Sequence, residues 1–288
     1  MPTRRKPRAW LLPEAIERPQ RCGGESLSYQ SIDVRVQEGI ARVALSQPEI
    51  GNPFNEVFCR EWALVADELA LRTDVRAVLI CAEGRYFSVG GDIGMFAKNL
   101  DELPLKIRHW TANLHMGLAR FARLDAPIVA AVHATAMGGA VALVAGCDVV
   151  YAARGARFGS AYTSIGYSVD AGASYSLAAR MGIARARRYV LCAEVLGADE
   201  AAAAGLVDVV VDDATLLAEA ERAAARLAGG PTRAYGEIRR LFRKSLMQPF
   251  EAQLEDEAQG LSKIAATADA REGIVSFVQK RKAAFTGK

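Results

Sequence analysis

Residues 127–148 decide the fold, and their sequence is PIVAAVHATAMGGAVALVAGCD. An apolar run at 128–132 is followed by Gly138 and Gly139 and then by the apolar residues 140–145. A short apolar run predicts a buried strand, paired glycines predict a tight turn, and an alanine-rich apolar segment predicts a buried helix. We therefore expect a strand, a glycine turn and a helix in immediate succession.

The uncharged stretch around this motif, residues 126–147, would be long enough to cross a bilayer. Pro127, His133 and three glycines interrupt it, and a buried strand and helix explain it without lipid. Near the N-terminus, Pro13 interrupts the apolar residues 10–12, so we expect no secretory signal. The sequence predicts neither a membrane span nor export.

Strand and helix patterns alternate on both sides of the motif. The predicted elements are a β-hairpin at 29–36 and 40–45, helices at 55–71 and 103–124, and strands at 75–81, 149–152 and 207–211. This alternation predicts a mixed α/β core with crossover connections. We divide the chain into a basic, disordered tail at 1–24, a core at 25–212 and a C-terminal helical subdomain at 213–288. A transit peptide is the alternative for the tail.

The charge of the chain is concentrated at its start. The 288 residues carry a formal net charge of +3, and the six basic and two acidic residues within 1–24 more than account for it. The remainder is slightly acidic, so we expect no nucleic-acid partner for the folded body. With 51% hydrophobic and 24% charged residues, the composition excludes a disordered chain and a disulfide-stapled miniprotein.

The cysteines and histidines predict no metal site. The five cysteines are widely spaced and form no C-x-x-C pair, and none of the three histidines has a ligand-like spacing. This usage is typical of buried thiols in a reducing cytoplasm. We expect a cytoplasmic protein without a metal.

Three glycine-containing segments, at 84–92, 136–140 and 165–172, stand out as candidate site loops. A glycine turn after a strand lets backbone N–H groups point into a cleft, and two converging N–H groups form an oxyanion hole. Neither a phosphate loop nor a dinucleotide-binding G-x-G-x-x-G is present where it would be needed, so a nucleotide cofactor is unsupported.

Several motifs occur in the order found in one enzyme family. Residues 46–55 (SQPEIGNPFN) are similar to RP-x-x-x-N-A-L/F-N, residues 87–92 (FSVGGD) are similar to F-x-A-G-A/G-D, and residues 127–148 match the long strand–turn–helix motif. Residues 205–208 and 271–281 match later signatures. From about Tyr29 to its end, the chain resembles the crotonase superfamily, the enoyl-CoA hydratase/isomerase family.

The resemblance implies a crotonase-like spiral of ββα units and an acyl-CoA thioester as substrate. It implies a homotrimer or a dimer of trimers, and no cofactor other than the coenzyme A that the substrate carries. It places the oxyanion hole at the backbone N–H groups of Gly91 and Gly139, where the enolate or tetrahedral oxygen of the thioester would be held.

The same resemblance implies which residues meet coenzyme A. These candidates are Pro53, Phe54, Val89, Gly91, Phe277 and Lys280. Phe277 and Lys280 align with positions that meet the nucleotide end of the coenzyme, often across a subunit interface. For Lys280, a solvated charge on a helix is an equal alternative.

The chain departs from the family where hydratases carry two glutamates. The first glutamate falls on Ala142 and the second on Tyr162. Alanine has no proton to exchange, and a tyrosine with an ordinary pKa of about 10 is a poor base at neutral pH. We therefore expect little hydration by the paired-glutamate route, and we expect Tyr162 to line the acyl pocket or to donate a hydrogen bond.

Asp170 supplies a different carboxylate. It matches the aspartate of subfamilies that include double-bond and ring-modifying isomerases related to phenylacetate catabolism, and 4-chlorobenzoyl-CoA dehalogenase. A carboxylate in a mostly apolar pocket suits proton shuttling. The alternative is that Asp170 caps a helix beginning near Ala171, since aspartate is a favoured N-cap.

His115 lies at the spacing of the catalytic histidine of that dehalogenase, and a histidine packed on a helix face is an equal alternative. Against the dehalogenase, the small Gly91 replaces a bulky aromatic residue.

The preferred hypothesis is isomerisation of an enoyl-CoA or ring-derived thioester through Asp170. The alternatives are a dehalogenase using Asp170 and His115, a hydratase without the glutamates, and an RNA- or acyl-CoA-binding protein on the same fold.

Overall fold

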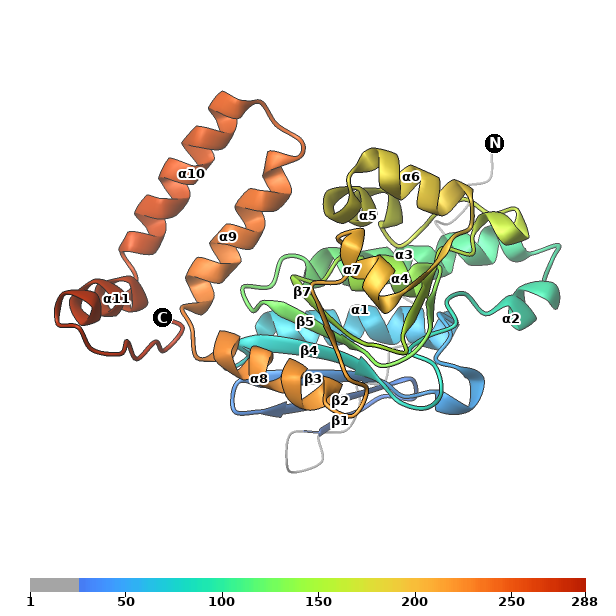
Figure 1. Cartoon of the computed structure of the whole chain (residues 1–288), viewed down its shortest axis with the longest axis horizontal. Helices are drawn as coiled ribbons and strands as arrows, with labels where there is room; N and C mark the ends of the chain where they lie inside the picture. Colours follow the sequence, from blue (N-terminus) through green and yellow to red (C-terminus); the bar gives the residue numbers. More distant parts are fainter. Residues whose placement is uncertain (1–25) are drawn as a thin grey trace, which may run out of the picture.

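The computed structural model describes residues 26–288, in which the strands form two sheets (Figure 1). The large sheet has the order β1-β2-β3-β4-β5-β7-β10, and the small sheet has the order β6-β8-β9. The strands of the large sheet are β1 (Ser26–Ser28), β2 (Ile32–Gln37), β3 (Ile40–Leu45), β4 (Ala77–Ala82), β5 (Ile128–Val132), β7 (Val149–Ala153) and β10 (Val209–Val211). Strands β1 to β3 are antiparallel, and β3, β4, β5, β7 and β10 run parallel. The predicted tail at 1–24 lies outside the described residues.

The predicted β-hairpin is confirmed, with a later start. Glu38 and Gly39 both have positive φ angles, as a two-residue hairpin turn requires. Strand β2 begins at Ile32 instead of residue 29 because the N–H groups of Gln30 and Ser31 donate to the carboxylate of Glu61. The predicted strand at 207–211 likewise begins later, at Val209.

The central parallel strands are covered on both faces, which explains their continuous apolar sequences. Helices α1 (Glu56–Leu71) and α3 (Leu103–Phe121) belong to the core on one face, and α8 (Leu216–Ala228) packs on the other. Helix α1 begins one residue after the predicted start, and its N-cap is Asn55, whose side chain accepts the Phe58 N–H. Trp62 on α1 stacks on Phe121 of α3, with ring centroids 4.3 Å apart, and so joins the two helices.

The decisive motif forms the strand, turn and helix that its sequence predicts. Strand β5 is fully buried, and α4 (Gly139–Ala145) begins one residue before the predicted start. Between them, β6 (Ala136–Met137) joins the small sheet with β8 (Arg157–Gly159) and β9 (Val195–Gly197). The short helices of this region are α2 (Ile93–Ala97), α5 (Ala173–Met181), α6 (Ile183–Leu191) and α7 (Ala198–Ala203), with 3-10 turns η1 (Pro48–Ile50) and η2 (Thr163–Ile165).

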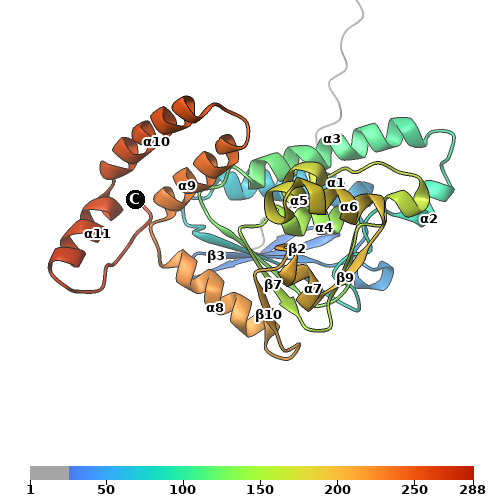
Figure 2. The same cartoon turned by 45° about the horizontal axis from the view of Figure 1, so that its top comes forward.

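The C-terminal region contains helices alone among its described elements. Helices α9 (Thr232–Ser245), α10 (Phe250–Ala265) and α11 (Ala268–Val278) extend away from the sheet in both views (Figures 1 and 2). We call α9 to α11 the arm. Helix α8 differs, because it packs directly on the large sheet.

The expectation of buried thiols needs one correction. Cys59, Cys81 and Cys147 are buried, but Cys192 is exposed because it follows the last turn of α6 at the surface. Cys22 lies outside the described residues. Within residues 26–288, no helix is both long and apolar enough to span a membrane, and no cluster of potential metal ligands is found.

Candidate active site

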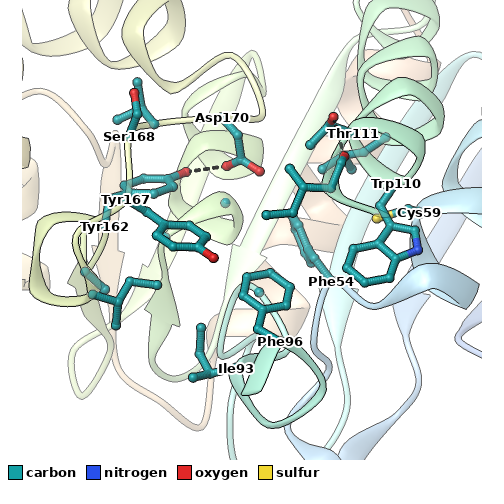
Figure 3. A pocket seen from close by; sticks show the side chains of 18 of the residues that line it. Phe54, Cys59, Ile93, Phe96, Trp110, Thr111, Tyr162, Tyr167, Ser168 and Asp170 are labelled. Carbon is teal, nitrogen blue, oxygen red and sulfur yellow. Dashed lines mark hydrogen bonds between the residues drawn. The ribbon is translucent and has the colours of Figure 1, made fainter. Parts of the chain in front are cut away.

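A cavity of about 370 Å³ lies between the glycine turns, α3 and the segment 161–170 (Figure 3). Its lining is mainly apolar and aromatic, with a few polar groups. The residues whose side chains or backbone define it include Phe54, Cys59, Gly91, Phe96, Trp110, Thr111, Gly139, Tyr162, Tyr167, Ser168 and Asp170. An apolar pocket with few polar groups is the usual form of a small-molecule site.

One side of the cavity is made of backbone. Among the described residues, no acceptor is found for the N–H groups of Gly91 and Gly139. Gly139 is the first residue of α4, where a helix has no internal acceptor for its N–H groups. Both predicted oxyanion-hole residues therefore line one cavity with their N–H donors free.

The glycines that precede these donors are required by geometry. Gly90 has a φ of 79°, and a Cβ there would lie 2.6 Å from the carbonyl oxygen of Met137. Gly138 has a φ of 52°, which also disfavours a side chain. The two turns are held together by the bridge between Ser88 and Ala136 and by the Met137 N–H, which donates to the Ser88 carbonyl.

The predicted carboxylate lines the cavity next to the second glycine turn. The Tyr162 hydroxyl donates to Oδ1 of Asp170 over 2.8 Å, and Figure 3 shows this pair beside the apolar lining. A Cβ on Gly139 would lie 3.6 Å from the same Oδ1, so the carboxylate is close to the second glycine turn. The predicted catalytic residues Asp170, Tyr162, Gly91 and Gly139 thus share one cavity.

Tyr162 is a donor and not a base in this arrangement. Burial, together with the charge of Asp170, raises the pKa of the Tyr162 hydroxyl well above its ordinary value. A protonated phenol can donate to a carboxylate, so Tyr162 fixes Oδ1 and leaves Oδ2 of Asp170 for a substrate. Of the two roles expected for Tyr162, the structure supports both lining and donation.

The helix-capping alternative for Asp170 is wrong. Helix α5 begins at Ala173, its N-cap is Gly172, and no side chain caps it. The backbone carbonyl of Asp170 does accept the Ala173 N–H, but its carboxylate is turned to Tyr162. A glycine can occupy the N-cap position because it takes the left-handed conformation there, which frees the aspartate side chain for the cavity.

His115 does not line the cavity. Its Nε2 accepts the backbone N–H of Ala171 over 3.1 Å, and the residue is exposed on α3. The structure therefore brings His115 to the residue after Asp170 but not to the cavity surface.

The aromatic lining was missed from the sequence. Phe96 stacks between Trp110 and Tyr167, with centroid distances of 6.1 and 5.9 Å. The signal for the α3 part was present, because the cavity-lining residues Ile107, Trp110, Thr111 and Leu114 have the spacing of one helix face. The contribution of Phe96 had no such signal. It fills the space beside Gly91, where a Cβ would lie 3.2 Å from its ring.

Ala142, where the resemblance places the first glutamate of hydratases, is buried within α4 and offers no polar side-chain group. Cys59 adds a thiol to the lining, and burial raises its pKa to about 12, with a further contribution from the charge of Asp170. Among the described residues that line the cavity, Asp170 is the one carboxylate.

The coenzyme candidates divide into two groups. Pro53 and Val89 line a second cavity of about 390 Å³ that shares Val89, Gly91 and Ile93 with the first. Phe54 lines the first cavity. Phe277 and Lys280 instead lie at the end of the arm, and Figure 1 shows α11 on the opposite side of the chain from α2. Within one chain they do not reach either cavity.

The sequence profile described as "Enoyl-CoA hydratase/isomerase" matches residues 35–288, which is most of the chain. The chain belongs to the enoyl-CoA hydratase/isomerase family. It is 35% identical to a protein of Rhodobacter capsulatus named "Probable enoyl-CoA hydratase", over 91% of this chain and 100% of that protein. These matches confirm the family that the order of the motifs predicts, and they identify the chain as a member of an enzyme family.

Other family members carry different activities in their names. The chain is 31% identical to the "1,2-epoxyphenylacetyl-CoA isomerase" of Escherichia coli, over 88% of this chain and 97% of that protein. It is 30% identical to the "Trans-2-decenoyl-[acyl-carrier-protein] isomerase" of Streptococcus mutans, over 91% and 100%. The relatives thus include hydratases and isomerases.

Solved structures of the family confirm the crotonase fold. A crystal structure of an enoyl-CoA hydratase from Polaromonas sp. JS666 has a TM-score of 0.84 and 27% identity, covering 88% of this chain and 99% of that one. An enoyl-CoA hydratase from Mycobacterium smegmatis has a TM-score of 0.81 and 26% identity, covering 88% and 98%. The mixed sheet and the C-terminal helices described above are features of this fold.

Proposed function

We propose that the chain isomerises the double bond of an enoyl-CoA or a ring-derived CoA thioester, with Asp170 carrying the proton. The observation that supports this most is the single carboxylate of the cavity, hydrogen-bonded by Tyr162 and lying close to Gly139. One carboxylate is sufficient for a proton shift, whereas the family's paired-glutamate hydration needs two.

The reaction follows from the positions of these groups. For a 3-enoyl thioester, Oδ2 of Asp170 takes a proton from C2, and the electron pair of that bond moves into the thioester to form an enolate. The N–H groups of Gly91 and Gly139 stabilise the enolate oxygen. Asp170 then returns the proton to C4 as the C2–C3 double bond forms, so no atom is gained or lost.

The apolar lining supports this chemistry by excluding water from the enolate. The Phe54 ring lies beside Gly139 and the Phe96 ring lies beside Gly91, with Trp110 stacked on Phe96. In such a site, fixed N–H donors stabilise a developing negative charge more than they would in water. Water near the conjugated product would also be scarce, which disfavours its hydration.

The experiment is a comparison of thioesters in deuterium oxide. We expect 3-enoyl-CoA to become 2-enoyl-CoA with little solvent deuterium at C4 by mass spectrometry, because Asp170 carries the same proton from C2 to C4. We also expect weak or no hydration of crotonyl-CoA. Aromatic-ring and 4-halobenzoyl thioesters belong in the same series. Crotonyl-CoA hydration at a rate typical of the family would contradict the proposal and favour a hydratase that works without the glutamates.

The dehalogenase alternative receives less support. It needs a histidine that activates water against an aspartyl ester, but Nε2 of His115 is engaged by the Ala171 N–H. Chloride release from the 4-chlorobenzoyl thioester, with a covalent adduct on Asp170 in the intact mass, would reverse this preference. The alternative of an RNA-binding protein is disfavoured by membership of an enzyme family.

We also propose that the enzyme assembles as a homotrimer or a dimer of trimers. The arm exposes large apolar side chains, including Phe242 (74% exposed), Phe250 (71%) and Phe277 (84%), which is unusual for a surface that meets only water. Self-association would cover them and could bring Phe277 and Lys280 to the coenzyme of a neighbouring subunit. Sedimentation velocity tests this, and a monomer at micromolar concentration would contradict it.

A further inference from the structure

The contact between His115 and Ala171 defines the state of the imidazole. A backbone N–H only donates, so Nε2 of His115 must carry its lone pair toward Ala171. The ring proton of the neutral imidazole is then on Nδ1. His133 shows the opposite arrangement, because its Nε2 lies 2.9 Å from the carbonyl oxygen of Gly84, which only accepts.

The backbone that His115 contacts is strained. Ala171 has a φ of 50°, a conformation that a residue with a side chain adopts at a cost, and it is buried. Ala161, directly before Tyr162, has a φ of 54°. The two residues of the hydrogen-bonded pair therefore each adjoin an alanine in the left-handed region. Such a backbone persists only where surrounding contacts hold it in place.

We infer that His115 is a positioning residue that holds the turn at Ala171 and thereby fixes the direction of the Asp170 carboxylate. The inference rests on the proposed role of Asp170 as the proton carrier. Without an acceptor from His115, the buried Ala171 N–H would lose its partner, and the turn could relax toward an ordinary conformation. Tyr162 fixes one carboxylate oxygen, and His115 fixes the backbone from which that carboxylate extends.

This role differs from that of a general base. A base must present a free lone pair to a proton in the cavity, and the Nε2 lone pair is already occupied. His115 is also absent from the described residues that line the cavity. It acts through Asp170 and does not touch the reacting atoms.

The first test uses NMR of the histidine side chains. Long-range ¹H–¹⁵N correlation distinguishes the two neutral tautomers, and the chain has three histidines, so single substitutions assign them. We expect the Nδ1–H tautomer for His115 and the Nε2–H tautomer for His133 as the internal control. An Nε2–H tautomer at His115 would overturn the inference.

The second test uses three variants at His115 and one control. A glutamine amide can occupy the position of Nε2, an asparagine amide is too short to do so, and leucine has no acceptor. We expect kcat to fall about 10- to 100-fold for His115→Asn and His115→Leu, with KM little changed. A displacement of a catalytic group by about 1 Å lowers the rate on this scale. His115→Gln should recover most of kcat. His109→Leu, an exposed histidine on the same helix, is the matched control.

The pattern of these outcomes distinguishes a positioning residue from a catalytic base and from a residue with no role in catalysis. Equal losses for His115→Gln and His115→Leu would indicate a catalytic base and contradict positioning. Equal kcat in all variants would also contradict it. Hydrogen–deuterium exchange of the peptide around Ala171 gives a result that needs no substrate: protection should be kept in His115→Gln and lost in His115→Leu. If the exchange result holds while no isomerisation occurs, the proposed function fails and the positioning contact stands.

Discussion

The cavity has two walls of different construction. We call Gly91 and Gly139 the backbone wall, and Tyr162 and Asp170 the side-chain wall. The backbone wall is held by backbone pairing between the segments at Ser88 and Ala136, and by the buried Ser88 hydroxyl, which accepts the Gly90 N–H. The side-chain wall comes from an irregular segment with two alanines at positive φ, and its geometry depends on single hydrogen bonds.

The two walls have different roles in the proposed reaction. N–H donors stabilise an enolate regardless of which step follows its formation, so they suit any reaction that passes through an enolate. In the proposed reaction, the carboxylate of Asp170 and its partner Tyr162 decide where a proton moves. We therefore expect family members named hydratase and isomerase to differ in the side-chain wall, where this chain has Tyr162 and Asp170.

The largest effect is expected from removing the carboxylate of the side-chain wall. Asp170→Asn keeps the size of the residue but cannot accept a proton, so we expect kcat for isomerisation to fall by about 10³-fold or more. Thioester binding, measured by calorimetry, should change much less because the backbone wall is intact. Comparable turnover in a correctly folded Asp170→Asn enzyme would show that another group carries the proton.

The next effect tests the backbone wall. Gly139→Pro removes one N–H donor, and loss of one oxyanion donor costs about 10²- to 10³-fold in kcat. A side chain here also approaches the Phe54 ring, with a Cβ at 3.1 Å, so Gly139→Ala is the matched control that keeps the donor. We expect the alanine variant to be far more active than the proline variant. Equal losses would mean that crowding, and not the donor, explains the result.

A smaller effect is expected within the side-chain wall. Tyr162→Phe removes the hydrogen bond to Asp170, and we expect kcat to fall about tenfold, as for one hydrogen bond to a charged group. Tyr167→Phe removes a second hydroxyl from the same cavity and is the control. Its loss should be below about threefold. If both variants behave alike, the Tyr162–Asp170 bond does not orient the base.

The same bond gives a prediction for the pH profile. Because the pKa of Tyr162 is raised above its ordinary value, the hydroxyl remains protonated when a free tyrosine would begin to ionise. As the pH rises from 8 to 10, kcat of the wild-type enzyme should therefore change in the same way as kcat of Tyr162→Phe. A fall in kcat over this range that is absent in Tyr162→Phe would show that the phenol ionises.

The smallest effect concerns a cavity group outside both walls. Burial raises the pKa of Cys59 to about 12, so only about one thiol in 10⁴ is ionised at pH 8. We expect iodoacetamide to modify the exposed Cys192 while kcat changes by less than about twofold. Peptide mapping identifies the modified residue. Rapid inactivation with alkylation at Cys59 would show that the thiol is accessible and reactive.

Much of the fold could be predicted because its signals are local. The run at 128–132, the glycines at 138 and 139 and the helix that follows specify their conformations through apolar burial and backbone freedom. The two glycine turns were identified in the same way, whereas Asp170 was identified from its match to the aspartate of family subgroups. The predicted start of β2 was wrong because the carboxylate of Glu61, which is distant in the sequence, accepts backbone N–H groups there. The predicted N-cap of α5 was wrong because Gly172 occupies that position instead of Asp170.

The sequence by itself determined the family, the strand–turn–helix motif and the absence of both hydratase glutamates, since each is a property of neighbouring residues. Only the tertiary structure decided that Tyr162 donates to Asp170, that His115 contacts Ala171 across 56 positions, and that Phe96 fills the space beside Gly91. These contacts depend on how α3 and the segment 161–171 pack against the glycine turns. Packing of distant segments is set by the whole core, so no local pattern records it.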